Sequence, residues 1–162
     1  MGIEIERKFL VSGDAWRAGP PGEVVRQGYL MSDAGLTVRV RRSGEAGYLT
    51  IKGPADGPAR PEYEYAIPVG DADEMLARLA RGGLIDKVRY RRPFAGLIWE
   101  IDVFGGDNDG LIVAEVELGR ADQVVELPPW VGAEVTHDPR YSNAALSRHP
   151  FRLWGSPTET GN

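Results

Sequence analysis

Polar and apolar residues alternate along the first ten residues of the chain. Glu4, Glu6 and Lys8 alternate with Ile3 and Ile5, a period of two that is typical of a β-strand with one apolar face. The alternation recurs further on, between turns rich in Gly, Pro and Asp. It predicts eight strands, at residues 2–10, 23–31, 36–42, 48–52, 60–69, 84–92, 97–104 and 111–118.

Helical spacing is clearest at 71–81, where Leu76 and Leu79 fall on one face. Asp71 is the expected N-cap of this helix and Gly82 its expected end. A helical turn at 122–125 and a second helix at 141–149 are also expected.

Eight mostly antiparallel strands with few helices indicate a mainly β (α+β) fold whose sheet closes or nearly closes. The chain has 162 residues, which is long enough to bury a core. We expect a single domain at 1–155 and a short polar tail at 156–162.

Charge along these strands is sorted by sign. Arg39 and Arg41 flank Val40, whereas Glu115 and Glu117 flank Val116. Solvated sheet faces usually mix signs, because like charges two residues apart repel and opposite cross-strand pairs attract. Separate clusters of cations and anions therefore suggest a site.

The charged face can lie outside or inside a closed sheet. An apolar interior with charges in water is the commoner arrangement in small soluble barrels. In the inverse arrangement helices and loops cover the apolar face, and the charges line the interior. The pattern is compatible with both. With the charges inside, the interior would hold eight basic and eight acidic residues: Lys8, Arg26, Arg39, Arg41, Lys52, Lys87, Arg89, Arg91, Glu4, Glu6, Glu62, Glu64, Glu100, Asp102, Glu115 and Glu117.

Composition excludes several classes of function. The formal net charge of −5 argues against a nucleic-acid surface, and the lack of cysteine excludes disulfides and thiolate chemistry. Charges begin at Glu4 and no apolar run approaches the roughly 20 residues of a membrane span, so we expect no signal peptide, no membrane contact and a cytoplasmic protein.

A balanced set of enclosed charges suits a ligand that itself carries anions and cations. Arginine and lysine bind phosphoryl oxygens, and carboxylates bind a hard cation such as Mg²⁺ or Mn²⁺. Polyphosphate with a divalent metal is such a ligand. Both histidines, His137 and His149, are expected outside the charged interior of the closed sheet.

The order of several short motifs resembles one known family. Glu4-Ile5-Glu6-Arg7-Lys8 fits the ExExK motif of the CYTH superfamily, the triphosphate tunnel metalloenzymes. The similarity continues through most of the chain, at residues 27–30, 38–41, 49–53, 62–64, 87–90, 99–102, 110–118 and 141–143. It implies an eight-stranded antiparallel β-tunnel with a charged lumen, closest to the compact bacterial inorganic triphosphatases.

The resemblance also implies roles for the charged residues. Glu4, Glu6 and Lys8 are the expected catalytic residues. The expected phosphate ligands are Lys8, Arg39, Arg41, Lys52, Lys87 and Arg89. The expected metal ligands are Glu4, Glu6, Glu100, Asp102, Glu115 and Glu117. Accessory roles fall to Glu62, Glu64, Arg26, Arg91 and Tyr29, of which Arg26 and Arg91 rest on strand phase alone.

The expected activity is metal-dependent hydrolysis of a triphosphate, with inorganic triphosphate as the first choice of substrate. Thiamine triphosphatase and class IV adenylate cyclase are the alternative enzymes in the family. A polyphosphate- or nucleotide-binding module is the non-enzymatic alternative, although a pure anion binder does not need six interior carboxylates. Either a monomer or a homodimer is compatible with the sequence.

Overall fold

The computed structural model describes residues 2–155, so Met1 and the expected tail at 156–162 lie outside the described residues. The strands are β1 (Ile3–Val11), β2 (Glu23–Asp33), β3 (Leu36–Ser43), β4 (Ala46–Lys52), β5 (Ala59–Ile67), β6 (Arg81–Phe94), β7 (Leu97–Phe104), β8 (Ile112–Glu117) and β9 (Val131–Glu134). The helices are α1 (Val69–Arg78) and α2 (Asn143–Arg148), with short 3-10 turns η1 (Ala15–Arg17), η2 (Gly106–Asn108), η3 (Pro139–Tyr141) and η4 (Phe151–Leu153).

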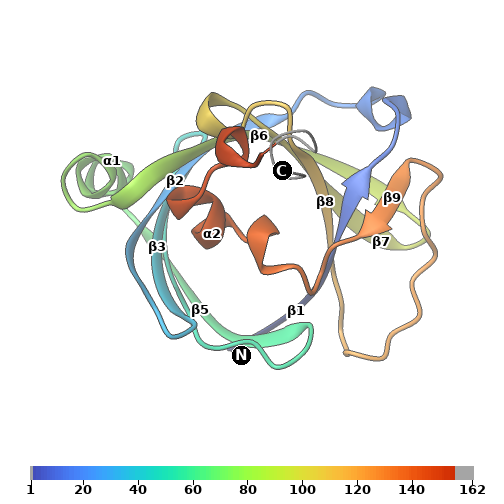
Figure 1. Cartoon of the computed structure of the whole chain (residues 1–162), viewed down its shortest axis with the longest axis horizontal. Helices are drawn as coiled ribbons and strands as arrows, with labels where there is room; N and C mark the ends of the chain where they lie inside the picture. The colour runs from blue at the N-terminus through green and yellow to red at the C-terminus, as the bar shows by residue number, and fades with distance from the viewer. Residues whose placement is uncertain (1, 156–162) are drawn as a thin grey trace.

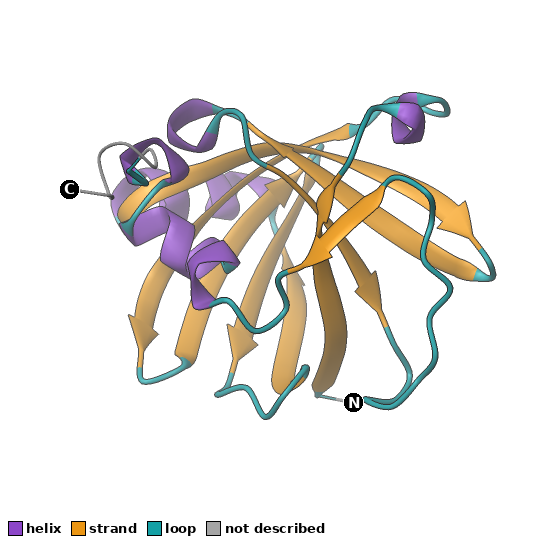
Figure 2. Cartoon of the chain, turned by 45° about the vertical axis from the view of Figure 1, so that its right-hand side comes forward, coloured by secondary structure: helices purple, strands orange, loops and turns teal. Residues whose placement is uncertain are grey.

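Eight of the strands form a closed barrel. Neighbouring strands pair antiparallel in the order β5-β4-β3-β2-β6-β7-β8-β1. The start of β1 also pairs with β5, with Ile3 opposite Pro61 and Ile5 opposite Ala59, and this contact closes the ring. Figure 1 shows the ring end-on, and Figure 2 shows its strands from the side. The predicted closed antiparallel barrel is confirmed.

Apolar side chains lie on the outside of this barrel wall. Ile101 lies opposite Ala114 in the β7–β8 pair, and both are fully buried. They belong to a cluster with Trp99 that is covered by Trp16 of η1 and by Trp130, which precedes β9. Turns and loops, rather than a second sheet, therefore remove this part of the outer wall from water.

Helix α1 covers another part of the outer wall, and it lies outside the ring in Figure 1. Its buried residues Ala72 and Leu76 pack against Val40 of β3. A Cβ atom at Gly47 would approach the Ala72 Cβ to 3.0 Å, so glycine at this position lets the helix sit close to the sheet.

Helix α2 lies across one end of the barrel (Figure 1). Phe104 lies opposite Lys87, and Val113 lies opposite Asp102, so both side chains face the interior. Leu146 of α2 packs against this apolar end of the interior, together with Ile85. The fold therefore has an apolar outer wall, a charged interior and an apolar closure at one end.

The predicted bounds of the helices were partly wrong. Helix α1 begins at Val69 with Pro68, not Asp71, at its N-cap, and the Ala72 N–H donates to the Pro68 carbonyl in the first turn. It ends at Arg78, because Arg81 already pairs with Tyr29 as part of β6. Neither helix among the described residues has the length and apolar character needed to cross a bilayer.

The chain after β8 also differs from the prediction. Residues 122–125 form no helical turn, and the expected helix at 141–149 is divided into η3 and α2 at Ser142, whose hydroxyl caps α2. The short strand β9 was not predicted. It pairs with the end of β1 through Val131 and Glu134, and four residues are too few to establish a recognisable alternation.

The outer wall supplies a test of which face holds the fold together. Ile101→Ala should lower the free energy of unfolding by about 2–5 kcal/mol, because it opens a cavity under the cover formed by Trp16 and Trp130. The matched control is Ile98→Ala on the same strand, where the side chain is 53% exposed and a change below about 1 kcal/mol is expected. Urea denaturation measures both, and equal losses would contradict the inside-out arrangement.

Candidate functional site

The register of the strands carries charged side chains to the inner face of the barrel. Glu6 lies opposite Glu117 and Lys8 lies opposite Glu115 in the β1–β8 pair. Residues directly opposite one another in antiparallel strands project from the same face. The alternation seen in the sequence therefore sends one charged row of each strand inward.

A polar cavity of about 230 Å³, which we call the inner cavity, lies within the barrel. All the residues predicted to face the tunnel line this cavity except Lys8, Arg26 and Asp102. Its lining residues are Glu4, Glu6, Arg39, Arg41, Lys52, Glu62, Glu64, Lys87, Arg89, Arg91, Glu100, Glu115, Glu117 and Asn143.

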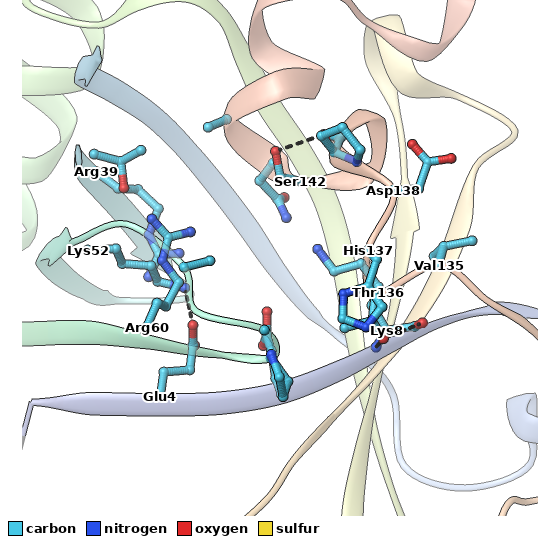
Figure 3. Close-up of a pocket in the computed structure, with 18 of the residues that line it drawn as sticks. Glu4, Lys8, Arg39, Lys52, Arg60, Val135, Thr136, His137, Asp138 and Ser142 are labelled. Carbon is cyan, nitrogen blue, oxygen red and sulfur yellow. Dashed lines mark hydrogen bonds and ion pairs between the residues drawn. The ribbon is translucent and has the colours of Figure 1, made fainter. Parts of the chain in front are cut away.

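A second cavity of about 370 Å³, the outer cavity, adjoins the first. The two share Glu4, Glu6, Arg39, Lys52 and Asn143 as lining residues, so they lie next to each other. Figure 3 shows this cavity, with Arg39 and Lys52 on one side and Lys8 on the other. Two further predicted residues, Lys8 and Tyr29, line the outer cavity.

One histidine lies at the outer cavity, which we take as the mouth of the tunnel. His137 lines the outer cavity beside Thr136 (Figure 3), but it is exposed and lies outside the strands, as expected, and it does not line the inner cavity. His149 is exposed and lines neither cavity. The segment after β9 turns back over the mouth, and its sequence has no alternation from which this position could be read.

Arg26 does not face the tunnel, and its predicted accessory role is wrong. Its Nε donates to Asp86 at 2.9 Å, and its side chain is 55% exposed. Gln27 holds the inward position instead, because it lies opposite Arg41 in the β2–β3 pair. The charge of Arg26 was the only basis for predicting which residues of β2 face inward. Counting back two residues from Tyr29 would have placed Gln27 on the inner face instead.

Asp102 sits behind the cavity wall as the partner of two cations. Its carboxylate accepts from Arg89 Nε at 2.7 Å and Nη2 at 2.8 Å, and Lys87 Nζ lies 2.9 Å from it. Burial alone would raise the pKa of Asp102, but the two cations outweigh burial and hold this pKa well below its usual range. Burial lowers the pKa of Lys87, and the neighbouring Arg89 and Arg41 add to that effect.

Most other charges of the two cavities are also paired. Lys52 Nζ lies 2.8 Å from Glu4 and 3.4 Å from Glu62. Arg39 lies 3.4 Å from Glu64, and their contact is bridged by the Thr50 hydroxyl. The remaining pairs are Lys8 with Glu115 at 3.6 Å, Arg89 with Glu100 at 3.3 Å, Arg89 with Glu115 at 3.8 Å and Arg91 with Glu100 at 3.3 Å.

Arg41 is the exception among the cations of the inner cavity. Within residues 2–155 no carboxylate lies within ion-pair distance of it. Its Nε donates to the neutral Gln27 Oε1 at 3.0 Å. Burial and the nearby Arg39 and Arg89 lower the pKa of Arg41 to about 10, which leaves it a cation at neutral pH.

Of the carboxyl groups that line the inner cavity, two likewise lack a cation within ion-pair distance among the described residues. Glu6 and Glu117 lie directly opposite each other, an arrangement that is unfavourable for like charges. Burial, Glu115 and Glu4 raise the pKa of Glu6 to about 8. Burial followed by Glu4 also raises the pKa of Glu117, so the charge of Glu4 acts on both.

The predicted ligands of the metal are therefore in different states. Glu4, Glu100, Asp102 and Glu115 already have cationic partners, whereas Glu6 and Glu117 do not. Over residues 2–155 there is no preassembled group of three or more carboxylate or imidazole side chains around one point. Three polar residues outside the predicted set also take part in the site: Gln27, Thr50 and Asn143, whose Oδ1 accepts from Lys87 Nζ at 3.0 Å.

The CYTH domain family matches residues 2–148 of this chain. A protein named inorganic triphosphatase from Acetivibrio thermocellus is 49% identical over 152 residues, which cover 94% of this chain and 97% of that protein. A protein of the same name from Nitrosomonas europaea is 40% identical over 152 residues, covering 89% of this chain and 96% of its own length.

Solved structures show the same architecture. A crystal structure of an inorganic triphosphatase superposes with a TM-score of 0.64 at 36% identity, covering 89% of this chain and 93% of that one. A protein from Pyrococcus horikoshii shares the fold with a TM-score of 0.57 at 18% identity, covering 73% of this chain and 80% of that one.

Pairing of the buried cations predicts a large effect on stability. Asp102→Asn should lower the free energy of unfolding by about 3–5 kcal/mol, because Lys87 and Arg89 are left buried without their shared carboxylate. Asp86→Asn is the matched control, since it breaks only the exposed pair with Arg26 and should cost less than about 1 kcal/mol. If the two variants unfold at the same urea concentration, Asp102 does not hold the cationic wall together.

Proposed function

Because the chain belongs to the CYTH family, we propose that it is a divalent-metal-dependent hydrolase that cleaves inorganic triphosphate to pyrophosphate and phosphate. The names of its two close relatives support this substrate. The observation that carries the proposal is the cavity itself, which is lined by the cation Arg41 and by the carboxyl groups of Glu6 and Glu117, none of which has an ionic partner among the described residues.

Six side chains are proposed to bind the phosphates: Lys8, Arg39, Arg41, Lys52, Lys87 and Arg89. A triphosphate carries several negative charges, and it can replace the internal carboxylates as partner of these cations. Charge-assisted contacts of guanidinium and ammonium groups to phosphoryl oxygens are the strongest hydrogen bonds available to them. Arg41 needs no such exchange, because it begins without a carboxylate partner.

The donor set fits a hard divalent cation. Mg²⁺ is typically held by one or two carboxylates together with substrate phosphates and water, and Glu6 with Glu117 supply such a pair. Glu4, whose charge acts on both, is the proposed third ligand. All three side chains bind a metal through carboxylate oxygens, which suit hard cations, so we propose Mg²⁺ or Mn²⁺.

When bound, such a cation would neutralise charge on the phosphoryl oxygens and on the leaving group. The chain supplies the remaining parts of the reaction. Water attacks the terminal phosphorus, the phosphoanhydride bond breaks, and charge moves onto the departing pyrophosphate. Basic residues around the cavity stabilise that charge, while Glu4 and Glu6 are proposed to orient the water and Lys8 to hold the transferred phosphoryl group.

Substrate and metal dependence test this proposal together. The purified chain should release phosphate from inorganic triphosphate with Mg²⁺ or Mn²⁺, and excess chelator should abolish the reaction. Parallel reactions with thiamine triphosphate and ATP, with phosphate, pyrophosphate and cyclic AMP measured separately, identify the alternative enzymes. Full hydrolysis in chelator would contradict the metal requirement, and cyclic AMP as the main product would contradict the proposed reaction.

Arg41 and Arg26 form a matched pair of arginines for the phosphate contacts. Arg41→Ala should lower kcat/KM by about 10- to 150-fold, the value of one charge-assisted contact that strengthens in the transition state. Arg26→Ala should leave hydrolysis unchanged, because that side chain lies on the outer surface with Asp86. Steady-state kinetics with inorganic triphosphate measures both. A parental rate in Arg41→Ala would show that Arg41 does not contact substrate.

A further inference from the structure

Gln27 occupies a fully buried position on the inner face of β2. It lies opposite Arg41 in the β2–β3 pair, so the two side chains project from the same face. Its Oε1 accepts the hydrogen bond from Arg41 Nε at 3.0 Å. Its Nε2 is buried and has no hydrogen-bond partner among the described residues. Among the described residues, the contact to Arg41 is therefore the one polar interaction of this side-chain amide.

The neutrality of this partner sets Arg41 apart from its neighbours. Every other cation of the inner cavity lies within 3.4 Å of a carboxylate: Arg39 with Glu64, Lys52 with Glu4, Lys87 with Asp102, Arg89 with Asp102 and Arg91 with Glu100. An anion that enters the cavity must compete with those carboxylates. It meets no such competitor at Arg41.

The hydrogen bond also leaves the binding end of Arg41 available. It engages Nε, and within residues 2–155 neither Nη atom of Arg41 donates to another protein group. Arg41 lines the inner cavity, and neither Nη atom is among the buried atoms that lack a partner. A guanidinium held through Nε presents its two Nη groups as a fork that fits two phosphoryl oxygens.

We propose that Gln27 is a positioning residue that orients Arg41 toward the substrate's phosphates without neutralising its charge, so that an uncharged acceptor at position 27 sets the affinity for triphosphate. This inference rests on the proposed function, because it assigns the anion to the same cavity. A carboxylate at this position would hold Arg41 equally well and would convert it into another internally paired cation.

Two substitutions separate charge from packing. Gln27→Glu preserves the size, the shape and the acceptor but adds a carboxylate, whereas Gln27→Met preserves the approximate volume and removes the acceptor. Gln27→Glu should raise the KM for inorganic triphosphate about tenfold or more, because the new carboxylate pairs with Arg41 and so weakens one charge-assisted contact to the substrate. It should unfold at the parental urea concentration or above, because Arg41 gains a partner beside Arg39 and Arg89.

Gln27→Met should raise KM less than Gln27→Glu does, because Arg41 keeps its charge and loses only its orientation. A purely structural role for Gln27 predicts the opposite order, with the isosteric Gln27→Glu close to the parental protein. That order would overturn the inference.

A double-mutant cycle with Arg41→Ala tests whether the effect passes through Arg41. The loss caused by Gln27→Glu should disappear in the Arg41→Ala background, whereas additive losses would overturn the inference.

Calorimetric binding of inorganic triphosphate in metal-free buffer keeps this test apart from the proposed function. A Kd that rises in Gln27→Glu supports the inference even if the parental protein proves to hydrolyse no triphosphate. An unchanged Kd contradicts it even if the parental protein is an active hydrolase.

Discussion

Charge enclosed in a closed barrel must be compensated, and this constraint governs the rest of the structure. Removing an ion from water costs several kcal/mol unless a partner of opposite sign is close. The interior meets this requirement with a connected set of pairs, of which the most buried joins Asp102 to Lys87 and Arg89. Among the described residues of the inner cavity, Arg41, Glu6 and Glu117 are left without a partner of opposite charge, and a bound anion or cation would supply one.

A charged interior also decides what lies outside the barrel. The apolar face of each strand cannot pack inward, so other parts of the chain must cover it. Trp16 and Trp130 cover β7 and β8, and helix α1 covers β3 and β4 through Ala72 and Leu76. Segments that look like simple connections in the sequence therefore supply much of the hydrophobic core. The interior of the barrel is held together by ion pairs instead.

The sequence was sufficient for the strands and for most of the cavity, because alternation with sorted charge is a local pattern. It misplaced Arg26, since the phase of β2 was taken from its one basic residue, whereas the pairing with β3 puts the neutral Gln27 opposite Arg41 on the inner face. It missed β9 and the place of His137 in the lining of the outer cavity, which depend on where the chain returns to β1. It could not separate Glu6 from Glu115, because which carboxylate finds a cation depends on contacts between distant strands.

The first strand has a consequence for how the chain folds. β1 joins residues 3–5 to 59–61 on one side and residues 6–10 to 113–117 on the other, and its end pairs with β9, so it completes its pairing only after residue 134 of the 162 has been synthesised. Contacts of such long sequence separation form slowly. Until then at least part of β1 has a free edge, the kind of edge from which aggregation begins. Glu4, Glu6 and Lys8 place charge along one face of β1, and charged side chains commonly protect exposed strand edges from aggregation. The charged side chains assigned to the site thus belong to a strand that stays partly unpaired until late in synthesis.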